Sequence, residues 1–313
     1  MSVFLLPTLE PVINRVLDAL GGAKFKLDVE VQNRKIDRLY TMAKRDQWNL
    51  DDNREHFFPP DRGGIDLNEW LGVDDDVRIA AARCFSSFYY GEHGAKVISA
   101  QLVNLMPTNE SSKFMATQVM DEARHVEVFE GILGFIDRIH PMNPFLNAFL
   151  GDISRVRHTG SKLIGMNLLV EGLALSSFRM ILREMRAGAN VSPRGYRAIG
   201  EPIESIIRDE SRHVGFGVVI LPELLHKIPR RIKAEMRIRQ LAWLGLLYGS
   251  VKYHQEDQEK MGLDYVQLLS DVIDDHEKRI QDCGGDALVS TERMKSLVPT
   301  MDRIVDRFRR KER

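Results

Sequence analysis

Hydrophobic residues recur every three or four positions along most of this chain, and strand-like alternation is nearly absent. Because an α-helix turns once every 3.6 residues, this spacing indicates helices with one apolar face. The pattern therefore predicts an all-α protein. The long helices that it predicts span about 77–106, 110–139, 160–187, 193–227 and 229–261. Shorter helices are predicted at about 7–20, 31–46 and 144–157, and in the C-terminal part.

Helix-breaking residues mark the ends of these segments. Pro107 separates the first two long helices, and Gly188 begins the turn between the third and the fourth. Ser192 and Pro193 supply an N-cap and a first-turn proline for the fourth helix. The stretch 47–64 contains Pro-Pro and Gly-Gly pairs, which predict irregular structure.

Neither a linker nor a low-complexity tract divides the chain. We therefore expect a single domain, residues 1–313. Its bundle core would span about 77–227, and accessory helices would lie in 1–64 and 229–313.

Composition narrows the class of protein without identifying a function. Hydrophobic residues make up 43% of the chain and charged residues 28%, which is ordinary for a globular protein. A net charge of −1 gives no general attraction to nucleic acid or to an anionic membrane. Two cysteines exclude a disulfide framework, and no apolar run reaches the roughly 18 residues of a membrane span. The first residues lack the basic region of a signal peptide, so we expect a cytoplasmic protein.

Two nearly identical words, DEARHV (121–126) and DESRHV (209–214), stand out from this background. Each places Glu-x-x-His on a predicted helix, with Glu122 and His125 in the first and Glu210 and His213 in the second. Residues three apart share one face of a helix. A single Glu-x-x-His is weak support for a site, but two near-identical copies indicate that both helices contribute to one.

Two further glutamates lie at matching heights in the predicted helices. Glu92 precedes Pro107 by 15 residues and Glu122 follows it by 15. In an antiparallel hairpin both lie about 22 Å from the turn. Glu171 and Glu210 are likewise equally far from the turn of the second hairpin. All four fall on the apolar stripes of their helices, so we expect them to meet inside a bundle.

Four carboxylates buried together require neutralisation, because an isolated buried charge costs several kcal/mol or more. Two divalent cations would balance four glutamates. Carboxylate and imidazole ligands suit iron or manganese. We therefore predict a dinuclear site of two Fe ions, or of Mn and Fe; the alternative is a buried polar network without metal. The predicted ligands are Glu92, Glu122, His125, Glu171, Glu210 and His213.

One glutamate from each of two helices and Glu-x-x-His from each of the other two resembles the ferritin-like diiron carboxylate proteins. The resemblance covers about residues 77–227. The fuller DExRH words look most like the hydroxylase subunits of bacterial multicomponent monooxygenases. The small subunit of class I ribonucleotide reductase and its ligand-binding oxidase relatives are also similar. The implied fold is a ferritin-like four-helix bundle with additional N- and C-terminal helices.

The resemblance also implies roles for residues around the ligands. Asp121 would accept a hydrogen bond from Nδ1–H of His213, and Asp209 one from Nδ1–H of His125. Such a bond fixes the tautomer of a histidine ligand and makes it more basic.

Arg124 and Arg212 would neutralise these two aspartates. Trp48 lies in RDQWNLDD, which resembles an N-terminal segment of reductase-like diiron proteins. There a tryptophan packs near the aspartate of the fourth helix and carries electrons. Ordinary packing of Trp48 is the alternative.

The chain also departs from each of these groups. Phe129 stands where the reductase subunit has its radical tyrosine, so a tyrosyl-radical subunit is not expected. Met166 and Gly94 stand at the two positions that form a crosslink in the ligand-binding oxidases. Ile206 replaces the third histidine of the arylamine N-oxygenases. The resemblance therefore implies shared chemistry and leaves the group open.

Helical phase predicts which residues flank the metals and shape a substrate cavity. Tyr89 is either a redox partner, a pocket wall or a plain core residue, and the others are alternatively core packing. The pocket candidates are Phe88, Tyr89, Ala95, Gln118, Phe129, Ala174, Phe178 and Ile206.

These observations favour an oxygen-activating oxidase or monooxygenase that uses O₂ to oxidise a small organic substrate. Hydroxylation, desaturation and N-oxygenation all remain open. Turnover would require a ferredoxin or flavin reductase as electron donor, and we expect a homodimer. The alternative is a ferroxidase or another iron-handling ferritin-like protein, for which the metal is the substrate.

Overall fold

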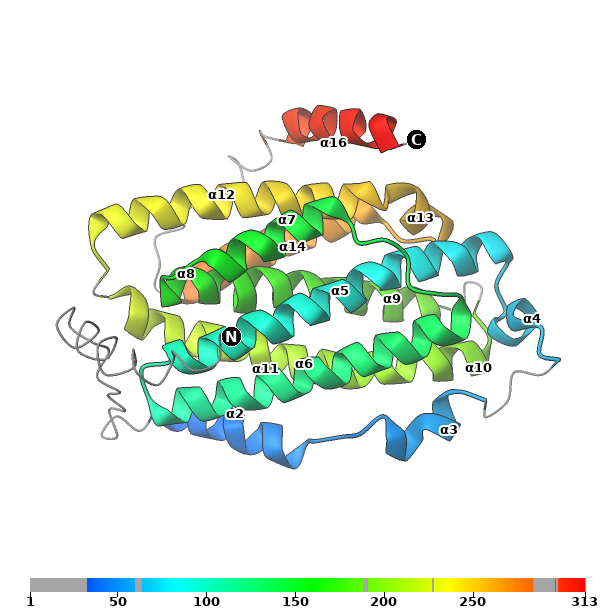
Figure 1. Ribbon diagram of the computed structural model, residues 1–313, viewed down its shortest axis with the longest axis horizontal. Helices are drawn as coiled ribbons and strands as arrows, with labels where there is room; N and C mark the ends of the chain where they lie inside the picture. The colour runs from blue at the N-terminus through cyan, green and yellow to red at the C-terminus, as the bar shows by residue number, and fades with distance from the viewer. Residues whose placement is uncertain are drawn as a thin grey trace, which may run out of the picture.

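The computed structural model describes residues 33–59, 64–187, 191–226, 228–283, 296 and 298–312. Within these ranges every regular element is a helix, as the periodicity predicts (Figure 1). The helix predicted at about 7–20 lies outside the described residues.

Long helical rods form the centre of the molecule (Figure 1). The first two are α5 (Asp75–Leu105) and α6 (Asn109–Ile136). The third consists of α8 (Thr159–Leu163), the π-helical segment η2 (Ile164–Val170) and α9 (Glu171–Arg186). The fourth consists of α10 (Pro193–Gly195), the π-helical segment η3 (Tyr196–Gly200) and α11 (Glu201–Leu225). The first four of the five predicted long helices are thus present, and the two π-helical segments were not predicted.

Capping residues fix where the rods begin, and therefore how high their glutamates lie. Before α6, the Thr108 hydroxyl accepts from the Ser111 amide, and the Ser111 hydroxyl accepts from the Thr108 amide. Before α10, the Ser192 hydroxyl accepts from the Gly195 amide at 2.9 Å, and Pro193 occupies the first turn. The Ser192 amide also donates to the Leu71 carbonyl at 2.7 Å. These bonds satisfy amides that lack a partner within the helix.

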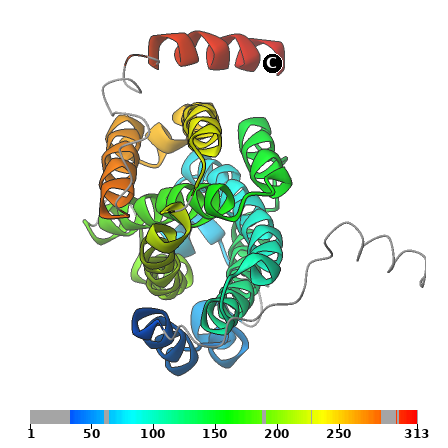
Figure 2. The same ribbon diagram turned by 90° about the vertical axis from the view of Figure 1, so that its left-hand side faces the viewer.

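Accessory helices cover the four rods on two sides (Figures 1 and 2). One side carries α2 (Arg34–Arg45), η1 (Asp51–Asn53) and α3 (Arg54–Phe57). The other carries α7 (Pro144–Arg155), α12 (Arg230–Tyr253), α13 (Gln255–Lys260), α14 (Tyr265–Asp282) and, outermost, α16 (Val298–Glu312). The short α4 (Leu67–Leu71) precedes α5.

Two predicted segments differ from the structure. The helix predicted over 229–261 is broken at His254, whose backbone (φ −97°, ψ 16°) departs from helical geometry and separates α12 from α13. The stretch 47–64, predicted as irregular, contains η1 and α3, and α4 follows it. Polar residues dominate η1 and α3, so the apolar periodicity that reveals a longer helix is missing.

Among the described residues, the third rod is the one helix that meets the length and composition of a membrane span. Thr159–Arg186 is long and apolar enough to cross a membrane by length and composition. However, 89% of its most apolar window is buried inside the protein. Its composition is therefore explained by its place among the other rods and under α14.

Candidate metal centre

Each of the four rods directs one glutamate into the middle of the bundle. Glu92 comes from α5, Glu122 from α6, Glu171 from the start of α9 and Glu210 from α11. None of the four is more than 4% exposed. The equal distances from the two turns thus bring the glutamates to one level.

The two histidines of the repeated words complete the cluster. His125 Nδ1 lies 3.3 Å from Glu92 Oε2 and 3.1 Å from Glu210 Oε1. His213 Nδ1 lies 3.0 Å from Glu210 Oε2 and 3.4 Å from Glu122 Oε1. Two groups form, and within each the possible ligand atoms lie within 4.8 Å of one another. The groups are Glu92, Glu122, His125 and Glu210, and Glu122, Glu171, Glu210 and His213.

Burial and charge shift the pKa values of these groups in opposite directions. Burial raises the pKa of Glu171, and the nearby carboxylates of Glu122 and Glu210 raise it further. Burial lowers the pKa of His213, but the same two glutamates outweigh this effect and raise it to about 10. Protons therefore occupy part of the cluster when no cation is present, and a metal must displace them to bind.

Two carboxylate oxygens in the cluster make no hydrogen bond. Glu122 Oε2 and Glu210 Oε1 are both buried, and His125 Nδ1, which lies 3.5 Å and 3.1 Å from them, makes no hydrogen bond to either. Such an oxygen is costly, because it has lost its hydration without gaining a hydrogen bond. Divalent cations at the two groups would satisfy these oxygens and offset the four negative charges. The residues present therefore fit a dinuclear iron or manganese–iron centre.

Asp121 and Asp209 lie behind the histidines. His213 Nε2 lies 3.1 Å from Asp121 Oδ2, and His125 Nε2 lies 3.3 Å from Asp209 Oδ2. The pairs are those expected, but the expected ring atom, Nδ1, is wrong. Nδ1 is closer to the backbone and faces the glutamates, whereas Nε2 reaches across to the neighbouring helix. A metal would accordingly bind at Nδ1, with Nε2–H donating to the aspartate.

The arginines of the two words join the aspartates across the bundle. Arg124 donates to Asp121 and lies 3.6 Å from Asp209 Oδ2. Arg212 donates to Asp209 and lies 3.5 Å from Asp121 Oδ2. Burial alone would raise the pKa of Asp209, but the bond from His125 and the charges of His125 and Arg212 lower it to about 2. Asp209 is therefore ionised and able to accept from His125.

Trp48 lies against this network, as the resemblance implied. Its indole Nε1–H donates to Asp209 Oδ2 at 2.9 Å. Its ring stacks on His125 with centroids 6.3 Å apart and an interplanar angle of 17°. The Arg124 guanidinium lies 5.2 Å from the ring centroid. Trp48 is partly exposed, so a continuous set of contacts leads from the surface to the buried cluster.

A second polar network lies on the other side of the cluster. Gln118 Nε2 donates to Glu171 Oε1 at 2.7 Å and to Glu122 Oε1 at 3.0 Å. Asn167, in the π-helical segment η2, donates to Gln118 Oε1 at 2.9 Å and to the His213 carbonyl at 3.1 Å. Gln118 was among the predicted residues, whereas Asn167 was not. A polar residue in the apolar run IGMNLLV is the signal that would have revealed it.

The predicted aromatic residues gather beside the carboxylates. Phe88 and Phe178 have centroids 4.8 Å apart, and Phe129 lies 5.7 Å from Phe88. Ile206 is fully buried in the same apolar cluster. Tyr89, in contrast, points outward: its hydroxyl donates to Glu130 in an exposed contact at 3.4 Å, so it does not wall the cavity.

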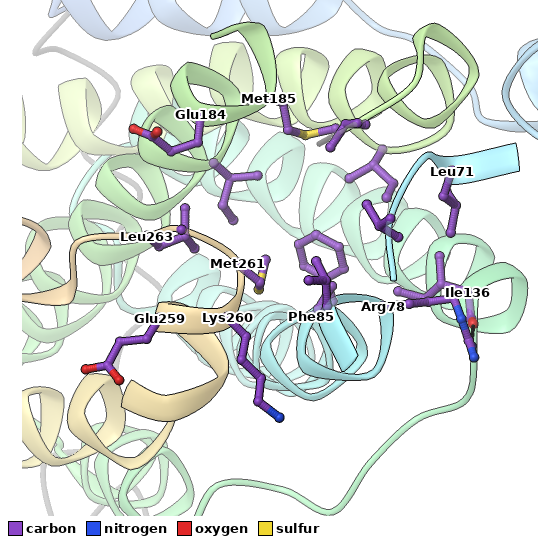
Figure 3. Close-up of a pocket in the computed structure, with 17 residues that line it drawn as sticks. Leu71, Arg78, Phe85, Ile136, Glu184, Met185, Glu259, Lys260, Met261 and Leu263 are labelled. Carbon is purple, nitrogen blue, oxygen red and sulfur yellow. Dashed lines mark hydrogen bonds between the residues drawn. The ribbon is translucent and has the colours of Figure 1, made fainter. Parts of the chain in front are cut away.

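Two cavities flank the aromatic cluster. One of about 80 Å³ reaches Glu92 and Glu171 and is also lined by Phe88, Ala95 and Ala174. The other, of about 200 Å³, lies near α4 and α13 (Figure 3). Phe85 forms part of its wall and lies 6.2 Å from Phe88, centroid to centroid, so aromatic rings separate the two cavities.

Solved structures with the same arrangement of helices include proteins that are named as oxidases. A protein with aldehyde deformylating oxidase activity from Synechococcus matches with a TM-score of 0.57 at 17% identity, over 75% of this chain and 100% of its own. An R2-like ligand-binding oxidase with a Mn/Fe cofactor matches with a TM-score of 0.56 at 21% identity, over 80% and 93%. A variant of that oxidase with a Fe/Fe cofactor gives a TM-score of 0.58 at 20% identity, again over 80% and 93%.

The chain has the ferritin-like fold. No family model and no curated protein sequence matches it. At these identities the likeness concerns the fold alone. The carboxylate–histidine cluster is an independent observation on the residues of this chain.

Proposed function

We propose that this protein is a dinuclear oxidase or monooxygenase that uses O₂ to oxidise a small organic substrate. The observation that carries the proposal is the buried cluster of four glutamates and two histidines beside an apolar cavity. The similar solved structures named for oxidase activity support it. Two Fe ions, or one Mn and one Fe, would occupy the two groups.

Each part of the site has a role in this proposal. Glu122 and Glu210 belong to both groups and would bind both ions, while Glu92 and Glu171 would each bind one. Bound in its reduced state, the metal pair supplies the electrons that activate O₂. Asp121 and Asp209 hold the histidine rings in one orientation and tautomer.

The side chains around the metal positions would protect the chemistry from water. Phe88, Phe129 and Phe178 fill the space beside the carboxylates and exclude solvent. The cavity at Glu92 and Glu171 would admit the substrate. Its apolar lining favours an organic molecule.

Turnover as an oxygenase would require two external electrons. The contacts from Trp48 through Asp209 to His125 offer a route for them. The partner would be a one-electron donor such as a ferredoxin, or a flavin reductase. Trp48→Phe would then slow reduction by the partner and leave metal content unchanged.

A ferroxidase is the second candidate, since the same ligands bind iron as a substrate. Iron entry is helped by carboxylates along the path. Around the cavity that reaches the cluster, the acidic residues lining it are Glu92 and Glu171 themselves. The remaining wall is mostly apolar, which favours an organic substrate over passing metal ions.

Metal content and O₂ uptake test the proposal together. The purified protein should bind about two Fe, or one Mn and one Fe, per chain, and the reduced form should consume O₂. Glu122→Ala removes a ligand from both groups, so metal affinity should fall on the order of 100-fold or more and O₂ uptake should be lost.

Glu127→Ala is the matched control, because Glu127 is an exposed carboxylate on the same helix. It should retain metal and O₂ uptake. A protein that binds only zinc and consumes no O₂ after reconstitution with iron or manganese contradicts the proposal.

A further inference from the structure

The cavity beside the metal cluster has two chemically different ends. Glu92 and Glu171 lie at one end, and Phe88 and Ala174 line the middle. Polar atoms reach the same cavity from Ser87 on α5, from His254 at the break between α12 and α13, and from Gln258 on α13. Those polar side chains do not belong to the metal cluster.

Ser87 and His254 connect to an ion pair at the surface. Ser87 Oγ lies 2.8 Å from His254 Nε2, and His254 Nδ1 lies 3.4 Å from Asp257 Oδ2. Arg83 donates to Asp257 Oδ1 at 3.1 Å. His254 is only 8% exposed. The arrangement therefore anchors a buried imidazole from outside the cavity.

Asp257 orients the His254 ring. Burial raises the pKa of Asp257, but the hydrogen bonds from His254 and Arg83 outweigh burial and lower it. Asp257 is thus a carboxylate and accepts from His254 Nδ1–H. Ser87 Oγ bonds to His254 Nε2 either as donor or as acceptor. In both cases a lone pair of Ser87 Oγ remains to accept a bond from a molecule in the cavity.

Gln258 adds a second free acceptor. Its Nε2 donates to the Val251 carbonyl at 3.3 Å, whereas its buried Oε1 has no hydrogen-bond partner. A buried acceptor without a donor costs about 1–3 kcal/mol, which a donor on a bound molecule would recover.

The Ser87–His254–Asp257 order resembles a nucleophilic triad, but the helix excludes that chemistry. Ser87 lies in the interior of α5, where backbone amides are bonded within the helix. No amide there is free to stabilise an oxyanion next to Ser87. Recognition of a ligand is the function that remains for these groups.

We propose that this cavity takes a small molecule with an apolar body and one hydrogen-bond-donating end group, a hydroxyl or an amine. The end group donates to Ser87 and Gln258, and the apolar part extends past Phe88 toward Glu92 and Glu171. Because this molecule would be the substrate of the oxidase, the inference rests on the proposed function. A volume of about 80 Å³ is smaller than the cavity of about 150 Å³ that binds benzene, so the molecule is small.

Two isomers of equal composition test the inference. Ethanol has a donating hydroxyl, whereas dimethyl ether has none. Ligand-detected NMR titrations of the purified protein should give about tenfold tighter binding of ethanol and of ethylamine than of the ether. Ser87→Ala should reduce that preference about tenfold and leave ether binding within about twofold.

Ser177→Ala is the matched control, because Ser177 is a buried serine that lines the same cavity from α9. It should keep the preference for the alcohol. Gln258→Met, which removes the unpartnered acceptor, should reduce the preference in the same direction as Ser87→Ala.

Equal binding of the alcohol and the ether to the unchanged protein, or no binding of either, overturns the inference. So does an equal loss of both ligands in Ser87→Ala. Metal content and O₂ uptake of the same preparations separate the two proposals. If the protein binds metal and consumes O₂ but shows no preference for ligands with a donor, the oxidase proposal is retained and the ligand inference is rejected. If it shows the preference but neither binds metal nor consumes O₂, the ligand class is retained and the oxidase proposal is rejected.

Discussion

At the scale of single residues, this protein places many ionisable side chains where water cannot reach them. Most are paired: Arg124 and Arg212 neutralise Asp121 and Asp209 across the bundle. His276 on α14 is different. Its Nε2 lies 3.3 Å from Gln240 Oε1, and its Nδ1 is buried without a partner.

His276 should make the protein less stable in mild acid. Burial, together with the charge of Arg279, lowers its pKa to about 3. In the unfolded chain a histidine titrates near 6.5, so below that pH the unfolded state binds more protons than the folded state. The free energy of unfolding therefore decreases as the pH is lowered. Between pH 7.5 and 5 this single group should cost about 2 kcal/mol.

Urea unfolding at both pH values measures this effect. His276→Gln should lose about 2 kcal/mol less than the unchanged protein over this interval. His226→Gln changes an exposed histidine and should show the full loss. The same pH dependence in His276→Gln would show that His276 is charged in the folded protein.

The sequence was sufficient to find residues that repeat and insufficient to find residues that do not. The two DExRH words and the equal helix arms locate Glu92, Glu122, Glu171 and Glu210, which the structure brings together. Asn167 belongs to no repeat, and its contact with Gln118 depends on the helix phase within η2. The contact between Ser87 and His254 joins residues 167 positions apart, which neither periodicity nor spacing reports.

At the scale of elements, the π-helical segment η2 shapes the third rod just before Glu171. Its wider turn leaves carbonyls that need donors from elsewhere. Arg279 on α14 supplies one, with Nη1 lying 3.4 Å from the Leu168 carbonyl oxygen. The same guanidinium lies close to Gly172, where an added Cβ would lie 2.2 Å from Nη1. An accessory helix therefore holds the backbone on either side of a candidate ligand.

The close approach of α11 to η2 should be visible in a pair of glycine substitutions. At Gly217 an added Cβ would lie 2.8 Å from Asn167 Cβ, whereas at Gly215 nothing lies within 4 Å. Both lie in the interior of α11. Gly217→Ala should destabilise the protein by about 1–2 kcal/mol through overpacking. Gly215→Ala should stabilise it by about 0.5–1 kcal/mol, because alanine favours helix.

Chemical denaturation of both variants checks this prediction. Equal effects of the two substitutions would mean that α11 and η2 do not pack this closely.

The long helices were predictable because each has an apolar face, but a π-helical turn has no distinct sequence pattern. The extra residue fits into the same apolar run, so the sequence alone predicts an ordinary helix there.

At the scale of the whole molecule, stability and metal binding should be coupled. Ions that bind only the folded state raise its free energy of unfolding by mass action, by about 2.7 kcal/mol at 100 times the dissociation constant. Anaerobic addition of Fe²⁺ or Mn²⁺ to metal-free protein should therefore raise Tm by about 4 °C. Differential scanning calorimetry measures the shift.

Glu122→Ala should show little of this rise, and Glu127→Ala should show all of it. A metal-induced rise of equal size in Glu122→Ala would place the ions elsewhere.

The accessory helices also contribute to the surroundings of the site. The segment α12–α14 supplies His254, Gln258 and Arg279, which all lie close to the metal cluster or its cavity. The homodimer stays a prediction.

The two repeated words frame the centre symmetrically, but their surroundings differ. The position formed with His125 lies next to Trp48, while the position formed with His213 lies next to Gln118 and Asn167. An indole and a pair of amides impose unlike polarity on two otherwise matched sets of donors. The two halves of the centre are therefore inequivalent, and they would differ in the order in which they fill and in the ion that each prefers.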